Sequence, residues 1–179
     1  MPSLTLDELK NFSNIKTPIF IETGTNIGDT INNMLNYFEQ LYSIELSHEL
    51  ANYSKNRFKD NSNVTIIEGD SSIILNSICN QSKPTFFWLD GHWSGGGTAR
   101  GKKDCPLLEE ISVININMKN ECIIAIDDVR LFGKRINEDW LDITRENILN
   151  IVKDRLVSCK YFPSSLDQED RMVLHLKGI

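Results

Sequence analysis

Paired cysteines are absent from this sequence. Its four cysteines stand at separated positions, Cys79, Cys105, Cys122 and Cys159. Without a C-x-x-C pair, the sequence gives no indication of a zinc site, and isolated cysteines are commonly small apolar residues of a core. We therefore expect free thiols and a reduced, cytoplasmic protein.

Long apolar runs are absent as well. No stretch approaches the roughly 20 apolar residues of a membrane-spanning helix. Residues 1–10 read Met-Pro-Ser-Leu-Thr-Leu-Asp-Glu-Leu-Lys and lack the basic and apolar regions of a signal peptide. We expect no membrane partner.

Positive charge is scarce. The 179 residues include 19 lysines and arginines against 25 aspartates and glutamates, which gives a net charge of -6. A nucleic-acid-binding domain normally presents a basic face, so we expect a small-molecule partner and no nucleic acid. The length suits one domain covering residues 1–179. No feature of the sequence indicates an oligomeric state.

The sequence contains only part of the glycine pattern that a pyrophosphate-binding site requires. Residues 19–30 read Ile-Phe-Ile-Glu-Thr-Gly-Thr-Asn-Ile-Gly-Asp-Thr, which predicts an apolar strand, a glycine turn and the start of a helix. A dinucleotide site needs G-x-G-x-x-G and a P-loop needs Gly-Lys-Ser/Thr. Asn26 and Asp29 stand where the second and third glycines would be, which argues against a nicotinamide-dependent oxidoreductase. This strand-turn-helix segment still lies at the carboxyl end of a strand, where open α/β sheets bind nucleotide-like ligands.

Apolar runs alternate with helical periodicity along the chain, a pattern typical of an α/β fold with a mainly parallel sheet. Residues 163–170 are too few for a crossover helix, so the last two strands should pair as an antiparallel hairpin. The expected strands are 18–22, 41–45, 64–68, 85–90, 121–127, 156–162 and 171–177. The expected helices are a short one at 4–12, one with Ile27, Ile31, Leu35 and Phe38 on one stripe, one capped by Ser47, and others at 72–79, 106–118 and 139–153.

The segment from Glu22 to Thr30 resembles motif I of the class I S-adenosylmethionine-dependent methyltransferases. The form is E-x-G-T-x-x-G-x-S/T, as in O-methyltransferases that act on catechols and macrolide sugars. The resemblance implies a Rossmann-like fold with a seven-stranded sheet in the order 3-2-1-4-5-7-6, and S-adenosylmethionine as the cofactor. The motif residues implied to bind it are Glu22, Gly24, Thr25, Asn26, Gly28 and Thr30. The alternative is that the glycines serve packing alone.

Two further strand ends carry candidate cofactor ligands. Glu45 ends the second strand. Its separation from Glu22 in the sequence is about that at which an acidic side chain contacts the ribose hydroxyls in related nucleotide-binding folds. Asp70 and Ser71 follow the third strand, and in similar methyltransferases the matching residues line the adenine pocket. The alternatives are a solvated carboxylate at Glu45 and a helix cap at Asp70 or Ser71.

Three aspartates follow the fourth and fifth strands. Asp90 ends the fourth strand, beside the cofactor, and Asp127 and Asp128 end the fifth. In the metal-dependent O-methyltransferases that this chain resembles, acids at these positions hold Mg²⁺ or another divalent cation, which binds substrate hydroxyls. Those proteins usually have extra N-terminal helices and a longer chain, and we expect neither here. The alternative is that Asp127 and Asp128 cap a helix or pair with Arg130 and Arg135.

His92 is the candidate general base. A neutral imidazole can accept a proton from a hydroxyl while the sulfonium gives up its methyl group. His92 lies two residues beyond Asp90, on the loop expected to face the substrate, and metal ligation is its second possible role. His92 and Asp90 are therefore the predicted catalytic residues.

A glycine-rich loop at 94–104 follows, with Arg100, Lys102 and Lys103. It is a candidate lid whose cations would meet an anionic group of the substrate, although basic loop tips are often only solvated.

Together these patterns predict a methyltransferase acting on a hydroxyl of a small molecule, with a sugar or glycan as the expected acceptor. The alternative is a protein of the same fold that binds cofactor or regulates another protein without transfer activity.

Overall fold

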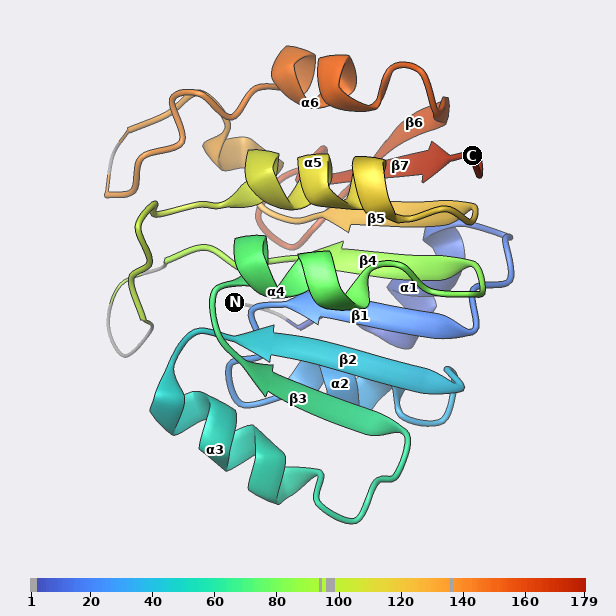
Figure 1. The fold of residues 1–179 in the computed structure, drawn as a ribbon. Helices are drawn as coiled ribbons and strands as arrows, with labels where there is room; N and C mark the ends of the chain where they lie inside the picture. The colour runs from blue at the N-terminus through green and yellow to red at the C-terminus, as the bar shows by residue number, and fades with distance from the viewer. Residues whose placement is uncertain (1–2, 94, 96–98, 136) are drawn as a thin grey trace.

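The computed structural model describes residues 3–93, 95, 99–135 and 137–179. Within these residues one seven-stranded sheet has the order β3-β2-β1-β4-β5-β7-β6 (Figure 1). The strands are β1 Ile19–Thr23, β2 Gln40–Glu45, β3 Val64–Glu68, β4 Thr85–Leu89, β5 Cys122–Ile126, β6 Leu156–Phe162 and β7 Arg171–Leu176. Both the strand order and the Rossmann-like class agree with the prediction.

The sheet is parallel except at one end. β1 pairs with β2 and β4, β2 with β3, and β4 with β5, all in parallel, whereas β7 runs antiparallel to both β5 and β6. The predicted hairpin is thereby confirmed. The carboxyl ends of the five parallel strands and the amino end of β7 consequently lie at the same edge of the sheet.

Helices cover both faces of the sheet (Figure 1). α1 (Leu6–Phe12) and α2 (Asp29–Met34) pack on one face, and α4 (Ser71–Ile78), α5 (Leu107–Asn117) and α6 (Arg145–Val152) pack on the other. α3 (His48–Arg57) lies against β2 and β3, and a 3-10 turn, η1 (Val129–Leu131), follows β5.

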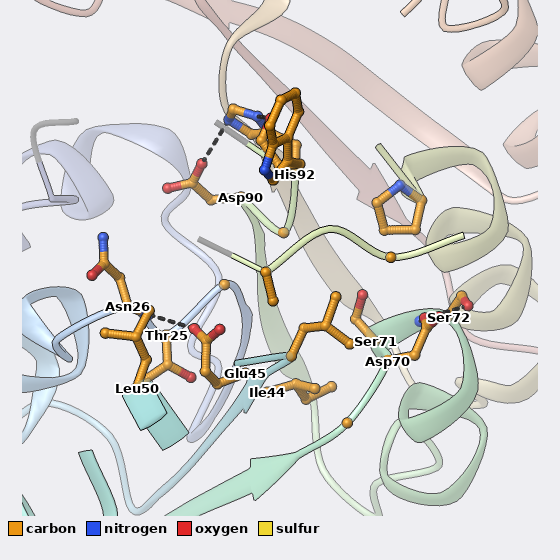
Figure 2. A pocket seen from close by; sticks show the side chains of 18 of the residues that line it. Thr25, Asn26, Ile44, Glu45, Leu50, Asp70, Ser71, Ser72, Asp90 and His92 are labelled. Carbon is orange, nitrogen blue, oxygen red and sulfur yellow. Dashed lines mark hydrogen bonds and ion pairs between the residues drawn. The ribbon is translucent and has the colours of Figure 1, made fainter. Parts of the chain in front are cut away.

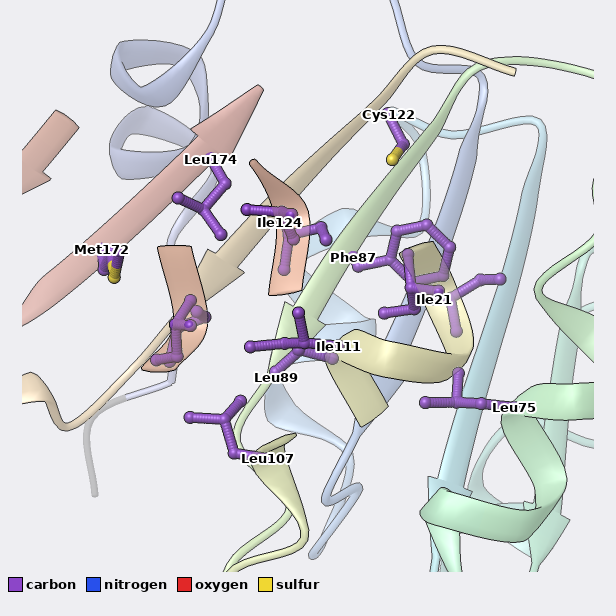
Figure 3. Close-up of a cluster of buried hydrophobic side chains, with 14 of the residues drawn as sticks. Ile21, Leu75, Phe87, Leu89, Leu107, Ile111, Cys122, Ile124, Met172 and Leu174 are labelled. Atoms are coloured by element: carbon purple, nitrogen blue, oxygen red, sulfur yellow. The ribbon is translucent and has the colours of Figure 1, made fainter. Parts of the chain in front are cut away.

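The alternation of side chains along β4 shows how the two cores form. Phe87 and Leu89 join the core beneath α4 and α5, and Phe86 and Trp88 join the core beneath α1 and α2. Successive strand residues point to opposite faces, and an all-apolar run is therefore what a strand covered on both faces requires. Figure 3 shows the first of these cores, where side chains of α4 and α5 meet those of β1, β4, β5 and β7.

Two helices begin later than the sequence predicted. Gly28 has a φ of +85°, so α2 begins only at Asp29, and Ile27 leaves the predicted apolar stripe and is 43% exposed. The helix predicted from 139 begins at Arg145, because the side chain of Thr144 accepts a hydrogen bond from the backbone N–H of Asn147 and caps it there.

The four cysteines are free, as predicted. Three of them are buried and Cys159 is partly exposed. Over the part of the chain that the structure describes, no helix has the length and apolar character needed to cross a bilayer.

Candidate active site

A cavity of about 530 Å³ opens at the carboxyl edge of the parallel strands. Its wall comes from the loops that follow β1, β2, β3 and β4, so four separate segments of the chain meet around it (Figure 2). The predicted site residues that line it are Gly24, Thr25, Asn26, Thr30, Glu45, Asp70, Ser71, Asp90 and His92. Glu22, Gly28, Asp127 and Asp128 are not part of this wall.

Gly24 is required by packing between two loops. It has a φ of +85°, and a Cβ atom at this position would lie 2.4 Å from the carbonyl oxygen of Asp90. Only glycine combines this backbone conformation with such a close approach. Gly24 therefore has the packing role given above as the alternative. Its close approach to Asp90 also brings the turn after β1 against the loop after β4.

Glu45 is held in place by backbone donors. The N–H of Asn26 donates to its Oε2 and the N–H of Ser47 donates to its Oε1, each at 2.8 Å. A carboxylate oxygen can accept more than one hydrogen bond, so both oxygens keep capacity for a ligand. Figure 2 shows the carboxylate between the turn after β1 and the end of β2, beside Leu50 and Ile44.

Asp70 caps α4 and lines the cavity at the same time. Its Oδ1 accepts hydrogen bonds from the backbone N–H of Ser72 at 3.0 Å and from the Ser72 hydroxyl at 2.6 Å. Ser71 lies next to it in the wall. The capping alternative thus describes Asp70 correctly, and its position in the wall leaves room for the predicted adenine contact.

Glu22 lies beneath the turn and does not reach the cavity. It is only 1% exposed, and it accepts a hydrogen bond of 2.5 Å from Ser43, whose hydroxyl also contacts that of Thr25 at 2.6 Å. Burial raises the pKa of Glu22 to about 8; the Ser43 hydrogen bond opposes this rise, and the charge of Asp90 adds to it. Glu22 therefore supports the turn as a largely protonated acid.

Asp90, His92 and Asp128 form a buried cluster at the other end of the cavity. Nε2 of His92 lies 2.7 Å from Oδ2 of Asp128 and 3.6 Å from Oδ1 of Asp90 (Figure 2 shows the latter contact). Burial lowers the pKa of His92, but the hydrogen bond to Asp128 and the neighbouring carboxylates outweigh it and raise the pKa to about 9. Burial and the charge of Asp127 raise the pKa of Asp90 well above its usual range. Without a further ligand the imidazole is therefore mainly protonated at neutral pH.

Glu138 completes this cluster from a distant part of the chain. Its Oε2 accepts hydrogen bonds from Nδ1 of His92 and from the indole Nε1 of Trp140, both at 2.8 Å. Sequence reasoning missed Glu138, which lies in an irregular segment without a motif. The only available signal was the nearby Trp140, because a buried indole N–H usually needs an acceptor.

The three aspartates predicted as one metal site are divided between two overlapping groups, one of Asp90, His92 and Asp128 and the other of Asp127, Asp128 and Asp170. Asp127 turns toward β7, where its Oδ1 accepts from Nε of Arg171 at 3.4 Å. Burial and the charge of Asp128 raise the pKa of Asp127 to about 6, although Arg171 opposes this rise. Asp128 instead contacts His92 and Arg130. Among the described residues, neither group of candidate ligands contains all three of Asp90, Asp127 and Asp128, so the predicted set stays a prediction.

The alternative of arginine pairing is correct for one aspartate. Asp128 pairs with Arg130, as proposed, but Asp127 pairs with Arg171, while Arg135 pairs with Asp139 at 3.5 Å. Asp128 also precedes η1 with a φ of +62°, so its side chain does not cap a regular helix.

In the described part of the basic loop after β4, ion pairs hold two of the three cationic side chains in place. Arg100 pairs with Asp104 at 2.6 Å and lies over the ring of Trp93 at 4.6 Å. Lys103 pairs with Glu109, and Lys102 lines the cavity. The glycine-rich part of the predicted lid, residues 94 and 96–98, lies outside the described residues, so the lid stays a prediction.

The fold of this chain is similar to the folds of several solved structures. A protein of Streptococcus mutans assigned as a methyltransferase, in complex with SAH, aligns with a TM-score of 0.62 and 14% identity over 100% of both chains. An S-adenosylmethionine-dependent methyltransferase of Aquifex aeolicus aligns with a TM-score of 0.60 and 13% identity, covering 97% of this chain and 88% of that one. The fold is that of the S-adenosylmethionine-dependent methyltransferases. An rRNA methylase of Streptococcus thermophilus is also similar, with a TM-score of 0.54 and 14% identity over 91% of this chain and 87% of its own.

The sequence itself matches no protein-family model and no curated protein. With sequence identities of 13–14%, the structural similarity establishes the fold alone, and residue roles must be argued from the site.

Proposed function

We propose that the protein is an S-adenosylmethionine-dependent O-methyltransferase that acts on a hydroxyl of a small molecule, with a sugar or glycan as the expected acceptor. The observation that carries the proposal is one cavity with two different ends. Glu45, held by backbone donors, lies at one end, and the Asp90–His92 pair lies at the other. Ligand pockets typically measure roughly 300–1,000 Å³, and this cavity is of that size.

The cavity wall suits each part of S-adenosylmethionine. The two oxygens of Glu45 can accept from the two ribose hydroxyls. Asp70 and Ser71 lie where the adenine would be, next to the apolar rim formed by Leu46 and Ile73. The turn that contains Gly24 and Asn26 then faces the amino acid part of the cofactor.

The proton of the acceptor hydroxyl must leave as the methyl group arrives. In this reaction a C–O bond forms and the C–S bond of the sulfonium breaks, so the transferred methyl needs no further activation. Both nitrogens of His92 already have carboxylate partners. Oδ1 of Asp90 is buried without a hydrogen-bond partner among the described residues. We therefore assign the proton to Asp90, with His92 as the group that positions it.

RNA is the competing class of acceptor, because the similar structures include rRNA methylases. The charge of this chain argues against it, since a net charge of -6 opposes binding to phosphates. Asp90, His92 and Trp93 line the cavity at the proposed reaction centre, and the cavity volume of about 530 Å³ suits a small acceptor.

Calorimetry and a transfer assay test the proposal in turn. Titration should show binding of S-adenosylhomocysteine and none of NAD. Transfer of labelled methyl groups from S-adenosylmethionine should then occur to members of a panel of sugars, glycosides and catechols, with an rRNA fragment as the comparison. Binding without any transfer would favour the binding or regulatory alternative, and transfer to the RNA alone would reject the small acceptor.

A further inference from the structure

We propose that the acceptor contains at least two sugar units, and that a second cavity binds the unit next to the one that is methylated. The first cavity is the one that contains Glu45 and Asp90, and the second has a volume of about 440 Å³. This inference rests on the proposed function, because it concerns the acceptor of that reaction. It adds a binding site and the chemistry of its ligand, which is uncharged and rich in hydroxyl groups.

The second cavity lies between the basic loop after β4 and the segment that joins η1 to α6. Its wall includes Arg100 and Asp104 from the loop, Leu108 from α5, and Arg135 and Asp142 from the later segment. Its volume is within the roughly 300–1,000 Å³ that is typical of ligand pockets, so one sugar unit would fit.

The two cavities adjoin near the proposed reaction centre. Residues 102–104 and Glu109 belong to the walls of both. Glu138 lines the second cavity, and its Oε2 lies 2.8 Å from Nδ1 of His92, which lines the first. An acceptor that presents one hydroxyl to Asp90 would therefore have its next unit at the second cavity.

Ion pairs between wall residues hold most of the charged side chains of the second cavity. Arg100 pairs with Asp104 at 2.6 Å, Lys103 with Glu109, and Arg135 with Asp139 at 3.5 Å. Asp104 also accepts a hydrogen bond of 3.1 Å from the backbone N–H of Asp139, which joins the basic loop to the segment after η1. These contacts order the wall before a ligand binds, which reduces the entropy lost on binding.

The wall of the second cavity is close to electrical neutrality. It contains four cationic and five acidic side chains, and the three ion pairs use three of each. Glu138 contacts His92, which leaves Lys102 and Asp142 as one cation and one acid without an ion pair among the described residues. A phosphate or carboxylate would meet at least as much negative as positive charge there. This argues against the anionic group expected from the sequence of the basic loop.

Three exposed side chains of this wall have polar groups without a hydrogen-bond partner in the described part of the chain, namely Lys102, Asn137 and Asp142. The ammonium of Lys102 donates, the carboxylate of Asp142 accepts, and the amide of Asn137 does both. A hydroxyl group also donates and accepts. The set therefore matches a ligand with several neighbouring hydroxyls, as in a sugar, and its exposure leaves room for a longer glycan to continue into solvent.

Binding of sugars to the full chain in the presence of S-adenosylhomocysteine tests the second cavity without any reaction. An array of neutral and acidic mono- and disaccharides should show preferential binding of neutral disaccharides. Monosaccharides, and disaccharides that contain a uronate or a phosphate, should bind more weakly.

Variants then locate the binding on the second cavity. Calorimetry with a neutral disaccharide from the array should show that Asn137→Ala and Asp142→Ala each weaken binding by roughly tenfold or more, as expected for a lost hydrogen bond. Glu146→Ala is the matched control and should keep the wild-type affinity, because Glu146 is an exposed acid of α6 outside this wall. All three side chains are exposed, and circular dichroism checks the folding of each variant.

Transfer kinetics separate this inference from the proposed function. With a disaccharide as acceptor, Asp142→Ala should raise KM by roughly tenfold and leave kcat near the wild-type value, because Asp142 lines the second cavity and not the first. With a monosaccharide as acceptor, both constants should equal those of the wild type.

Three results would overturn the second binding site: no sugar bound on the array, tighter binding of acidic than of neutral disaccharides, or a disaccharide affinity that Asn137→Ala and Asp142→Ala leave unchanged. Methyl transfer to monosaccharides or catechols alone would reject this inference and leave the proposed function standing. Disaccharide binding that both variants weaken, without any methyl transfer, would support the binding site and reject the proposed reaction.

Discussion

The guanidinium of Arg171 donates to the carboxylate of Asp127 across the antiparallel pair of β7 and β5. Both side chains are buried, and the same guanidinium also reaches Glu8 of α1 and lies 5.5 Å from the ring centre of Trp88. This contact separates Asp127 from Asp128 and joins the N-terminal helix to the edge of the sheet.

Replacement of Arg171 by methionine should destabilise the fold. It leaves Asp127 buried without its cation, and breaking a buried pair from one side typically costs about 3–5 kcal/mol. Urea denaturation should therefore show a lower free energy of unfolding. The double variant Arg171→Met with Asp127→Asn should recover part of the loss, and a double variant as unstable as the sum of both single variants would show that the pair is not coupled.

Glu45→Ala should weaken binding of S-adenosylhomocysteine by on the order of 1–3 kcal/mol, the range for hydrogen bonds to a charged group that are left unmade. Isothermal calorimetry measures the affinity. Glu68→Ala is the matched control, because Glu68 is opposite Glu45 in the pairing of β2 and β3 but is exposed and contacts His48 and Lys55. Equal affinities for both variants would reject the assigned role of Glu45.

Gly24→Ala should destabilise the protein more than Gly133→Ala. Both glycines have a positive φ, but a Cβ at Gly24 would collide with the backbone of Asp90, whereas one at Gly133 would meet nothing within 4 Å. The Gly133 variant isolates the conformational cost, about 1–2 kcal/mol. Thermal unfolding of both should show the larger loss at Gly24, together with weaker cofactor binding. Similar losses would mean that the loop after β4 moves aside easily.

Glu22→Gln should change how stability depends on pH. The pKa of Glu22 is raised from an ordinary 4.5 to about 8, so between these values the folded protein keeps a proton that the unfolded chain has released. The free energy of unfolding of the wild type then falls as pH rises through this window and levels off above it. Relative to the wild type, Glu22→Gln should gain on the order of a few kcal/mol between about pH 5 and pH 8 in urea titrations. A constant difference would contradict the raised pKa.

The sequence predicted what depends on local pattern. The apolar run Phe86 to Leu89 predicted a strand, and the short connection at 163–170 predicted a hairpin. Glu45 and Asp70 were found because each follows a strand, and every strand end of a parallel sheet points to the same edge. Helix starts were less certain, since Gly28 and Thr144 set them through backbone conformation and capping.

Long-range pairing could not be predicted from these patterns. Asp127 and Asp128 were predicted to act together because they are adjacent in the sequence, yet Asp127 contacts Arg171 and Asp128 contacts His92. Glu138 reaches His92 from a segment with no periodicity. Such contacts depend on where loops lie after folding, and a single sequence carries little information about that.

The antiparallel direction of β7 also determines when, during synthesis of the chain, the ion pairs at this edge of the sheet can form. Because the strand enters the sheet antiparallel, its first residue Arg171 and the preceding Asp170 meet the ends of strands made much earlier in synthesis. Until the ribosome has added these two residues, Asp127 has no guanidinium and Arg130 has only one of its two carboxylates. The electrostatic balance at this edge therefore depends on residues that are synthesised after the loops that line the cavity.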